Sequence, residues 1–218
     1  MACLLFRLEG PLQSWGYRSR FVDRDTAMEP TKSGIIGLLC CALGVDRSRS
    51  PSELAELKVH VRVDRQGTLL SDFQTAGGGV FRGSRAYYAP KSDGGASENP
   101  VIQTKHYLQD AAFTVALEGR EELLERLAKA LEDPHWPPFL GRKSCPPAAP
   151  FMPRLLRNAS ARDALQSDAD KGARFLWEAD EGELRADVPL RWSSSVDREY
   201  GYRFVQGELH LEEEEETE

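Results

Sequence analysis

The chain has 218 residues, 40% of them hydrophobic and 29% charged, a composition typical of a folded globular protein and not of a disordered one. No apolar run approaches the roughly 20 residues that cross a membrane, and the first residues lack the pattern of a signal peptide, so we expect a cytoplasmic protein without a membrane partner. The formal net charge of −7 argues at first against nucleic acid. However, residues 208–218 carry seven acidic side chains, and the rest of the chain is formally neutral. Local basic patches on that remainder can still bind nucleic acid.

The first predicted elements are a buried strand and a capped helix. Residues 2–8 are apolar except at one position and predict the strand. In residues 30–44 the apolar side chains recur at helical spacing. Thr31 is the expected N-cap of this helix, and Gly44 is the expected left-handed residue that ends it.

The start of this helix has the features of an anion site. Lys32 and Ser33 lie beside the free backbone N–H groups of the first turn, where phosphate binds well. Gly34 and Gly37 each cost about 1 kcal/mol relative to Ala, so we expect close approach of a strand or of a ligand backbone. The alternative is a helix that packs on a sheet and binds nothing.

A short helix and two strands are predicted next. Residues 50–53 resemble a capping box that opens a helix through Leu57. Residues 59–63 alternate valine with polar side chains and predict a half-buried strand. After a turn, residues 68–73 predict a further strand.

Between residues 72 and 100 the regular pattern fails. Glycines surround residues 81–88, which combine aromatic and basic side chains. Aromatic rings stack on bases while arginine holds phosphates, so this composition favours nucleic-acid binding. A surface hairpin without a ligand is the alternative.

The following segment predicts two strands and a helix. Residues 101–108 and 111–117 are expected to pair with each other. Residues 119–131 predict an amphipathic helix with acidic side chains in its first turn.

The last third contains a proline-rich connection and weaker signals. Closely spaced prolines in residues 137–147 predict an extended path that presents Arg142 and Lys143. The remaining predicted elements are a helix near 161–167 and strands near 174–178, 184–192 and 202–211.

No metal, cofactor or nucleotide-hydrolysis site is predicted. The Lys32–Ser33 pair lacks the glycine pattern of a phosphate-binding loop, and the four histidines have no metal-ligand spacing. The cysteines show no paired motif and are expected to be reduced: Cys3, Cys40, Cys41 and Cys145.

One group of adjacent side chains has the composition of an acid–base site. Lys105, His106 and Tyr107 are suited to metal-free RNA cleavage, in which a base takes the ribose 2′-hydroxyl proton and a cation stabilises the phosphorane. Adjacent residues of a strand point to opposite faces, which argues against joint action.

Four motifs in this order and spacing resemble one family. They are G-P-L-Q-S-W-G at 10–16, P-T-K-S-G-I-I-G-L-L-C-C-A-L-G at 30–44, T-K-H-Y-L-Q-D-A-A-F at 104–113 and F-L-G-R-K-S-C-P-P at 139–147. Across roughly residues 1–150 the chain resembles the CasD family, RAMP-superfamily subunits of the type I-E CRISPR Cascade complex that hold the five-prime handle of the guide RNA.

The resemblance implies an α+β fold. Residues 1–150 are expected to form a ferredoxin-like (RRM-like) RAMP domain with an inserted β-hairpin, the thumb, at about 73–108. Residues 151–218 are expected to form a small, mostly β extension that ends in the acidic tail.

The resemblance also implies a function. The expected role is a non-catalytic subunit of an antiviral surveillance complex that caps the handle of the guide RNA (crRNA) and docks the backbone RAMP subunit and the large subunit, with target DNA an indirect partner. The expected RNA-binding residues are Gln13, Ser14, Trp15, Arg18, Arg20, Lys32, Ser33, Arg82, Arg85, Tyr87, Lys105, His106, Arg142, Lys143 and Ser144.

Two other functions stay open. Subtype I-C relatives cut precursor RNA with a Tyr, Lys and His set, so a metal-independent endoribonuclease is the first alternative, using Lys105 and His106 with Tyr17 or Tyr107. The second is an adaptor protein without RNA contact, which fits the acidic tail. For Trp15 considered alone, a place in the core is the alternative to a base-stacking role.

Overall fold

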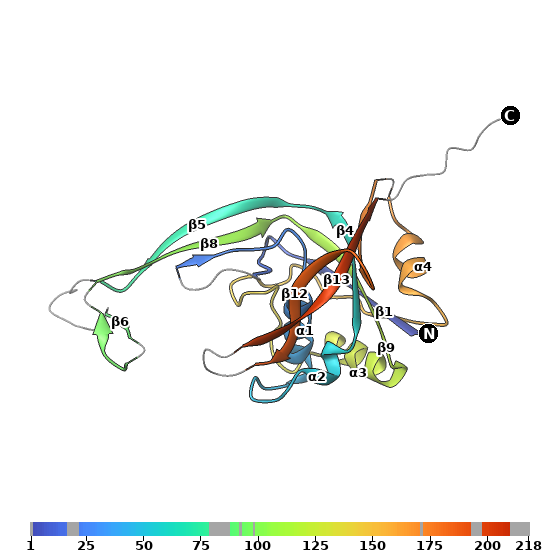
Figure 1. The fold of residues 1–218 in the computed structure, drawn as a ribbon, viewed down its shortest axis with the longest axis horizontal. Coiled ribbons are helices and arrows are strands. Elements are labelled where there is room, and N and C mark those ends of the chain that lie inside the picture. The colour runs from blue at the N-terminus through green and yellow to red at the C-terminus, as the bar shows by residue number, and fades with distance from the viewer. Residues whose placement is uncertain are drawn as a thin grey trace.

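The structure is a computed structural model that describes residues 2–16, 22–78, 88–91, 93–97, 99–170, 172–192 and 198–209. It is a mixed α/β fold dominated by sheet, with few helices (Figure 1). The helices are α1 (Lys32–Leu43), α2 (Ser52–Ala55), α3 (Glu121–Glu132) and α4 (Ala161–Gln166). The strands are β1 (Ala2–Glu9), β2 (Leu12–Gln13), β3 (Asp23–Arg24), β4 (Lys58–Arg65), β5 (Thr68–Ala76), β6 (Ala89–Pro90), β7 (Ala96–Ser97), β8 (Val101–Gln109), β9 (Ala112–Gly119), β10 (Arg154–Arg157), β11 (Arg174–Ala179), β12 (Glu183–Arg191) and β13 (Glu199–Leu209).

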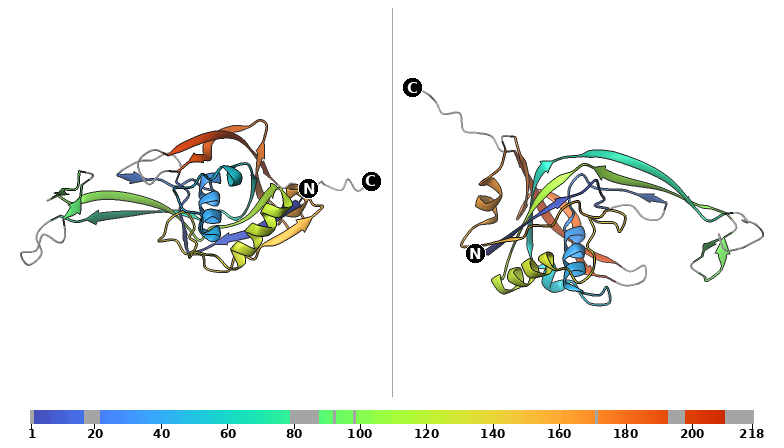
Figure 2. Two further views of the ribbon diagram at one scale, coloured as in Figure 1. Left: turned by 90° about the horizontal axis from the view of Figure 1, so that it is seen from below. Right: turned by 180° about the vertical axis from the view of Figure 1, so that it is seen from behind.

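The body of the molecule is an antiparallel seven-stranded sheet in the order β10-β1-β9-β4-β11-β13-β12. Its first half follows the chain order β1–α1–β4–β9–α3–β10. The main core lies between one face of the sheet and helices α1 and α3 (Figure 2). A smaller core lies on the other face, where α4 packs on side chains such as Phe175 and Trp177.

The predicted strand at residues 59–63 is buried on both faces, so the prediction of a half-buried strand was wrong. The valines face the main core, while His60 and Arg62 on the other face are also buried. Arg62 donates to the backbone oxygen of Leu165 and to Asp168, beside α4. The polar residues of this strand therefore find hydrogen-bond partners within the protein. The alternation of valine with polar residues did not reveal that α4 covers the polar face.

The predicted pairing of residues 101–108 with 111–117 was also wrong. β8 pairs with β5, whereas β9 pairs with β4 and β1. The pairing of β4 with β9 ends at Arg65 and Ala112, and that of β5 with β8 begins at Thr68 and Gln109. The two pairs therefore form one continuous two-stranded ribbon, which leaves the main sheet between these residues. Beyond this level the β5–β8 hairpin extends away from the body as a long arc (Figure 1).

Two local predictions need correction. Helix α2 is shorter than predicted and has Pro51 as its N-cap in place of Ser50, although the Ser50 hydroxyl accepts the Ser52 N–H at 3.3 Å. The proline-rich segment is not extended around Arg142. Leu140 donates to the backbone oxygen of Cys145 at 2.7 Å, and the Cys145 N–H donates to that of Arg142 at 2.8 Å, which closes a compact turn.

The C-terminal third adds strands to the existing sheet. β10, which the sequence pattern did not reveal, pairs with β1 at one edge, and β11 pairs with β4 toward the other. A division near residue 150 stays a prediction, although both sides contribute to one sheet. In the part of the chain that the structure describes, no helix combines the length and apolar character needed to cross a membrane.

Candidate nucleic-acid interface

Helix α1 begins as its sequence predicts. Thr31 caps it by accepting a hydrogen bond from the Gly34 N–H at 3.2 Å, and Gly44 ends it with a positive φ of 71°. A Cβ atom on Gly34 would lie 2.7 Å from the ring of Trp15, so this glycine permits close packing of that ring. The close approach that the glycine implied is made by a core side chain of the same chain.

The anion at the start of α1 is Asp187 of β12. Its carboxylate accepts the backbone N–H of Lys32 at 2.8 Å and two hydrogen bonds from Arg203 at 2.7 and 2.9 Å. The Lys32 ammonium donates to Glu178 at 2.7 Å, and Arg203 also reaches Glu178 at 3.1 Å. We call Lys32, Glu178, Asp187 and Arg203 the charge cluster. It joins α1 to β11, β12 and β13.

The environment of the charge cluster is strongly desolvated. Burial lowers the pKa of Lys32, although Glu178 opposes this effect. Burial alone would raise the pKa of Asp187, but the hydrogen bonds from Arg203 and the Lys32 N–H bring it below its usual range. Two cations and two carboxylates thus compensate one another inside the fold.

Three of the residues predicted to bind RNA at this end are buried and have partners within the protein in this structure. Lys32 is 3% exposed and is committed to Glu178, while Trp15 is 1% exposed and lies in the main core. Gln13 is fully buried, accepts the Trp15 ring N–H and donates to the backbone oxygen of Ala111. Ser33, whose hydroxyl lies 3.4 Å from that of Thr31, is partly exposed. Of Lys32 and Ser33, only Ser33 is therefore accessible to solvent.

A second group of predicted residues meets where the β5–β8 hairpin leaves the body. We call residues 23–25, 104–107 and 142–144 the hairpin root. β3 pairs in parallel with β8 here, with Arg24 beside Lys105. Ser14 lies beneath it, buried, and donates to the backbone oxygen of His106 at 3.1 Å. Of the root residues, Asp23, Arg24, Lys143 and Ser144 are exposed, Tyr107 is buried, and the others are partly exposed.

Arg142 holds the hairpin root together. Its guanidinium donates to the backbone oxygens of His106 at 3.1 Å, Arg24 at 2.8 Å and Asp25 at 3.0 Å. The same group lies 4.9 Å from the centre of the Tyr107 ring. Arg142 therefore has a structural role in this conformation, whereas its neighbour Lys143 is exposed.

The three side chains of the endoribonuclease alternative do not converge. His106 contacts Ser71 at 2.8 Å and Asp23 at 3.0 Å. Lys105 donates to Gln74 at 2.6 Å, and Tyr107 is buried beneath Arg142. Neighbouring residues of β8 alternate between its two faces, as the strand geometry predicts. Lys105 and Tyr107 therefore share one face of β8, and His106 lies on the other.

Two polar partners at the root were missed by sequence reasoning. Ser71 lies directly opposite His106 in the β5–β8 pair, and Asp23 reaches the same imidazole from β3. Both are ordinary polar residues in the sequence, and their importance depends on strand pairing between distant segments. Six predicted residues lie outside the described residues: Tyr17, Arg18, Arg20, Arg82, Arg85 and Tyr87.

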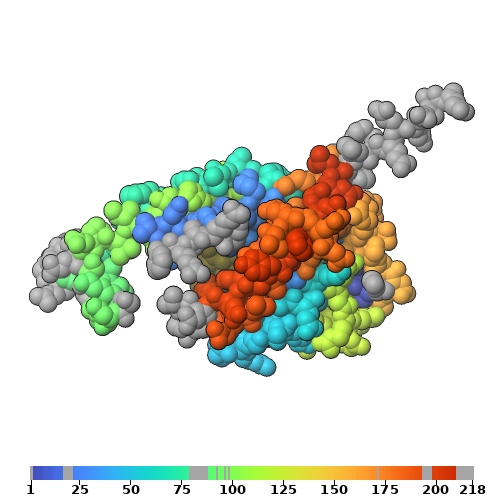
Figure 3. Space-filling view, in the orientation of Figure 1, coloured from blue at the N-terminus to red at the C-terminus, as the bar shows by residue number. Residues whose placement is uncertain are grey.

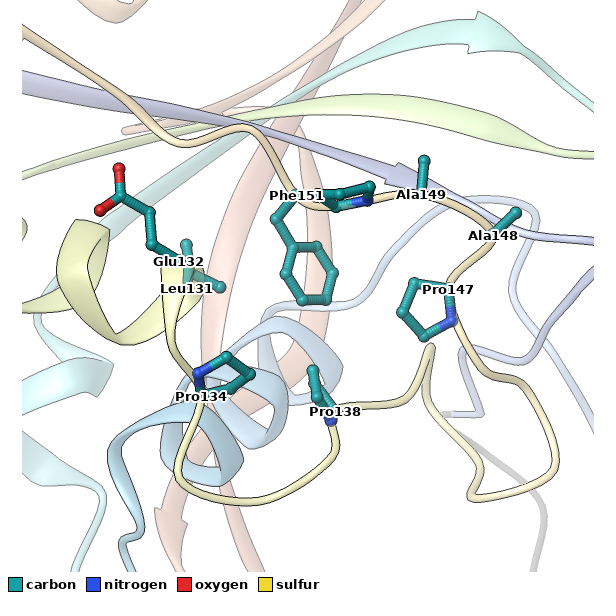
Figure 4. Close-up of a pocket in the computed structure, with 9 residues that line it drawn as sticks. Leu131, Glu132, Pro134, Pro138, Pro147, Ala148, Ala149 and Phe151 are labelled. Carbon is teal, nitrogen blue, oxygen red and sulfur yellow. The ribbon is translucent and has the colours of Figure 1, made fainter.

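A pocket of about 320 Å³ lies away from the hairpin root. Figure 4 shows Leu131 and Glu132 of α3 beside Pro134, Pro138 and Phe151 around this space. Its lining is mostly proline, alanine and other apolar residues and includes none of the predicted site residues. Among the described residues, no group of three or more His, Cys, Asp or Glu side chains is placed to hold a metal.

Comparison with known proteins decides the family. Residues 3–206 match the family described as "CRISPR-associated protein (Cas_Cas5)". The chain belongs to the Cas5 family of CRISPR-associated proteins. Its similarity extends to the "CRISPR system Cascade subunit CasD" of Escherichia coli (strain K12), which is 35% identical over 169 residues, covering 74% of this chain and 75% of that protein.

Two solved structures with related sequences agree with this membership. A chain of a "CRISPR RNA-guided surveillance complex" superimposes with a TM-score of 0.80 at 32% identity, covering 95% of this chain and 89% of that one. A second, described as "Crystal structure of Cas protein", gives a TM-score of 0.71 at 39% identity over 95% and 94% of the two chains. The fold is therefore shared along almost the whole chain.

Proposed function

We propose that this Cas5 protein is a non-catalytic subunit of a CRISPR Cascade complex that binds the five-prime handle of the guide RNA. The observation that carries the proposal is its 35% identity to a protein named as Cascade subunit CasD, together with a TM-score of 0.80 to a chain of a surveillance complex. In such a complex it caps the guide RNA and contacts the backbone and large subunits.

The hairpin root is the surface proposed for the RNA. Lys143, Ser144 and Lys105 offer accessible donors there, and His106 offers a ring that can contact a base. Sequence-specific RNA recognition favours single-stranded ends, with phosphate contacts setting position and stacking contributing roughly 1–3 kcal/mol per base. The charge cluster has no such role, because its cations already have carboxylate partners.

The fold supports the expected division into a ferredoxin-like domain and a thumb. We infer that β1–α1–β4–β9–α3–β10 forms the ferredoxin-like (RRM-like) domain, and the strand order β10-β1-β9-β4 favours it. The β5–β8 hairpin is the proposed thumb. It begins at Thr68, before the predicted start at 73, and reaches toward the guide RNA and a neighbouring subunit.

Charge reversal at the root tests the proposal. The chain is co-expressed with the other Cascade subunits and a CRISPR array, and the guide RNA that co-purifies is quantified. The double variant Lys105→Glu with Lys143→Glu should retain at least tenfold less guide RNA, because two accessible cations become anions that repel phosphate. Lys129→Glu is the control for a single charge reversal, since it changes an exposed lysine on α3, outside the hairpin root.

Three outcomes are distinguishable. Wild-type RNA content in the double variant removes the root from the binding site. Absence of both guide RNA and Cascade subunits from the wild-type preparation contradicts the proposed function itself. A cyclic-phosphate product from repeat RNA incubated with the isolated chain in EDTA, lost in His106→Ala, replaces it with the endoribonuclease function.

A further inference from the structure

The terminal hairpin of the sheet exposes an apolar patch. Leu184 of β12 lies opposite Phe204 of β13, and Tyr202 is two residues from Phe204 on the same face. Leu184, Phe204 and Tyr202 are 54%, 40% and 69% exposed, whereas the intervening Arg203 is buried as part of the charge cluster. Figure 3 shows β12 and β13, in orange and red, uncovered across the front of the body. We call Leu184, Tyr202 and Phe204 the hairpin patch.

The surroundings of the hairpin patch are acidic at one end. The turn between β11 and β12 carries Asp180 and Glu181, both exposed, and Glu183 opens β12 beside Leu184. Phosphates are repelled by such a turn, so a nucleic acid is disfavoured here although aromatic rings are present. Six of the nine residues after β13 are glutamate, a composition that suits solvent better than an apolar face.

The size of the hairpin patch argues against a homodimer. Three side chains exposed to this degree present roughly 300–400 Å² of mostly apolar surface, comparable to the largest patch of a typical monomer. A stable two-fold dimer needs about 800 Å² from each copy, so two patches facing each other fall short. A contact of this size suffices where other contacts already hold the partner nearby.

We propose that the hairpin patch docks another protein subunit of the same complex, through an apolar surface bordered by Lys or Arg that faces the turn at residues 180–183. The proposal rests on the proposed function, because the additional contacts come from the assembly. The partner packs on the outer face of the strands. Edge-to-edge pairing with β12 is disfavoured because Pro189 and two register shifts interrupt that strand.

Two variants of the full chain, assembled with the other subunits and guide RNA, test the proposal. Tyr202→Thr with Phe204→Thr removes the aromatic surface and retains side chains that suit a strand. Asp180→Lys with Glu181→Lys reverses the charge of the turn and leaves the apolar residues in place. Met152→Asn is the matched control, because Met152 is 65% exposed and lies just before β10, at the opposite edge of the sheet.

Native mass spectrometry of the assembled complexes gives the readout. Both patch variants should retain one protein subunit at least tenfold less well and keep guide RNA at the wild-type level, and the control should match wild type in both. Full retention of every subunit in both variants overturns the docking surface. Loss of guide RNA with all subunits retained assigns the patch to RNA and overturns it as well.

Two further outcomes separate the remaining possibilities. If the isolated wild-type chain is a dimer that Tyr202→Thr with Phe204→Thr converts to a monomer, the occupant is a second copy and the proposal is wrong. If the wild-type chain assembles with neither subunits nor guide RNA, the proposed function fails and this proposal fails with it. Unchanged melting temperatures of the variants establish that the effects arise from docking.

Discussion

The start of α1 and the hairpin root carry similar sequence signals but have opposite environments. Both combine lysine or arginine with serine and backbone donors, which is the composition of an anion site. At the start of α1 the anion comes from the chain itself, since Asp187 accepts the Lys32 N–H. At the root, Lys143 and Ser144 are exposed. The comparison teaches that a helix N-terminus predicts an anion but does not say whether the anion is a ligand or a distant carboxylate.

Removal of Asp187 should have the largest effect on stability. Asp187→Ala leaves the Arg203 guanidinium and the Lys32 N–H without their carboxylate in a buried site, so we expect a loss of about 3–5 kcal/mol. Urea unfolding followed by circular dichroism measures it. Glu183→Ala on the same strand is the control and should change stability by less than about 1 kcal/mol, because this side chain is 58% exposed. A loss below about 1 kcal/mol for Asp187→Ala would show that the cluster is unimportant for the fold.

Two glycines of α1 differ in how much space surrounds them. A Cβ on Gly34 would meet the Trp15 ring at 2.7 Å, whereas one on Gly37 would approach only Trp192, at 3.8 Å. Gly34→Ala should therefore destabilise the protein by about 1–3 kcal/mol. Gly37→Ala should stabilise it by up to about 1 kcal/mol, because alanine favours the helix. Thermal unfolding of both variants tests this, and equal shifts in the same direction would contradict the packing role of Gly34.

The sequence predicted local structure well where neighbouring residues determine it. Thr31 and Gly44 cap α1 as expected, because capping is decided within a few residues. The burial of Lys32 was not predictable, since Glu178 and Asp187 lie 146 and 155 residues away in the chain. β8 was recognised as a strand, but alternation does not identify the partner of a strand.

In the candidate site too, single residues were predictable from the sequence, but the partners that strand pairing brings to them were not. Arg142 and His106 were identified from residue type and motif, and the Arg142 guanidinium donates to the His106 backbone oxygen, while their role toward RNA stays a prediction. Asp23 and Ser71 were missed because only the pairing of β3 and β5 with β8 brings them to His106. Trp15 was assigned to RNA because of its neighbours, whereas the structure gives it the core position that a large apolar ring favours.

Acid should destabilise the fold through His60, which is hydrogen-bonded to Glu178 of the charge cluster. Its Nδ1 accepts the backbone N–H of Glu178, and its Nε2 faces Glu118 at 3.4 Å. Burial lowers the pKa of this imidazole below 6.5, although Glu118 and Glu178 act in the opposite direction and Lys58 lowers it further. Its contribution to stability is therefore present above pH 6.5 and is lost as the pH falls, by at most about 1.4 kcal/mol per pH unit.

Urea unfolding between pH 7.5 and 5 measures this dependence. His60→Gln removes the titrating group, so its stability should fall less steeply with acid than that of the wild type. Equal slopes for the two proteins would mean that another group accounts for the pH dependence.

The most direct test of the account is ultraviolet crosslinking of the guide RNA in the assembled complex, with crosslinked peptides identified by mass spectrometry. The account predicts crosslinks from the handle to residues 104–107 and 142–144 and none to residues 31–34, where Glu178 binds the Lys32 ammonium and Asp187 binds the Lys32 N–H. Crosslinks to Lys32 or Ser33 without any at the hairpin root would contradict it.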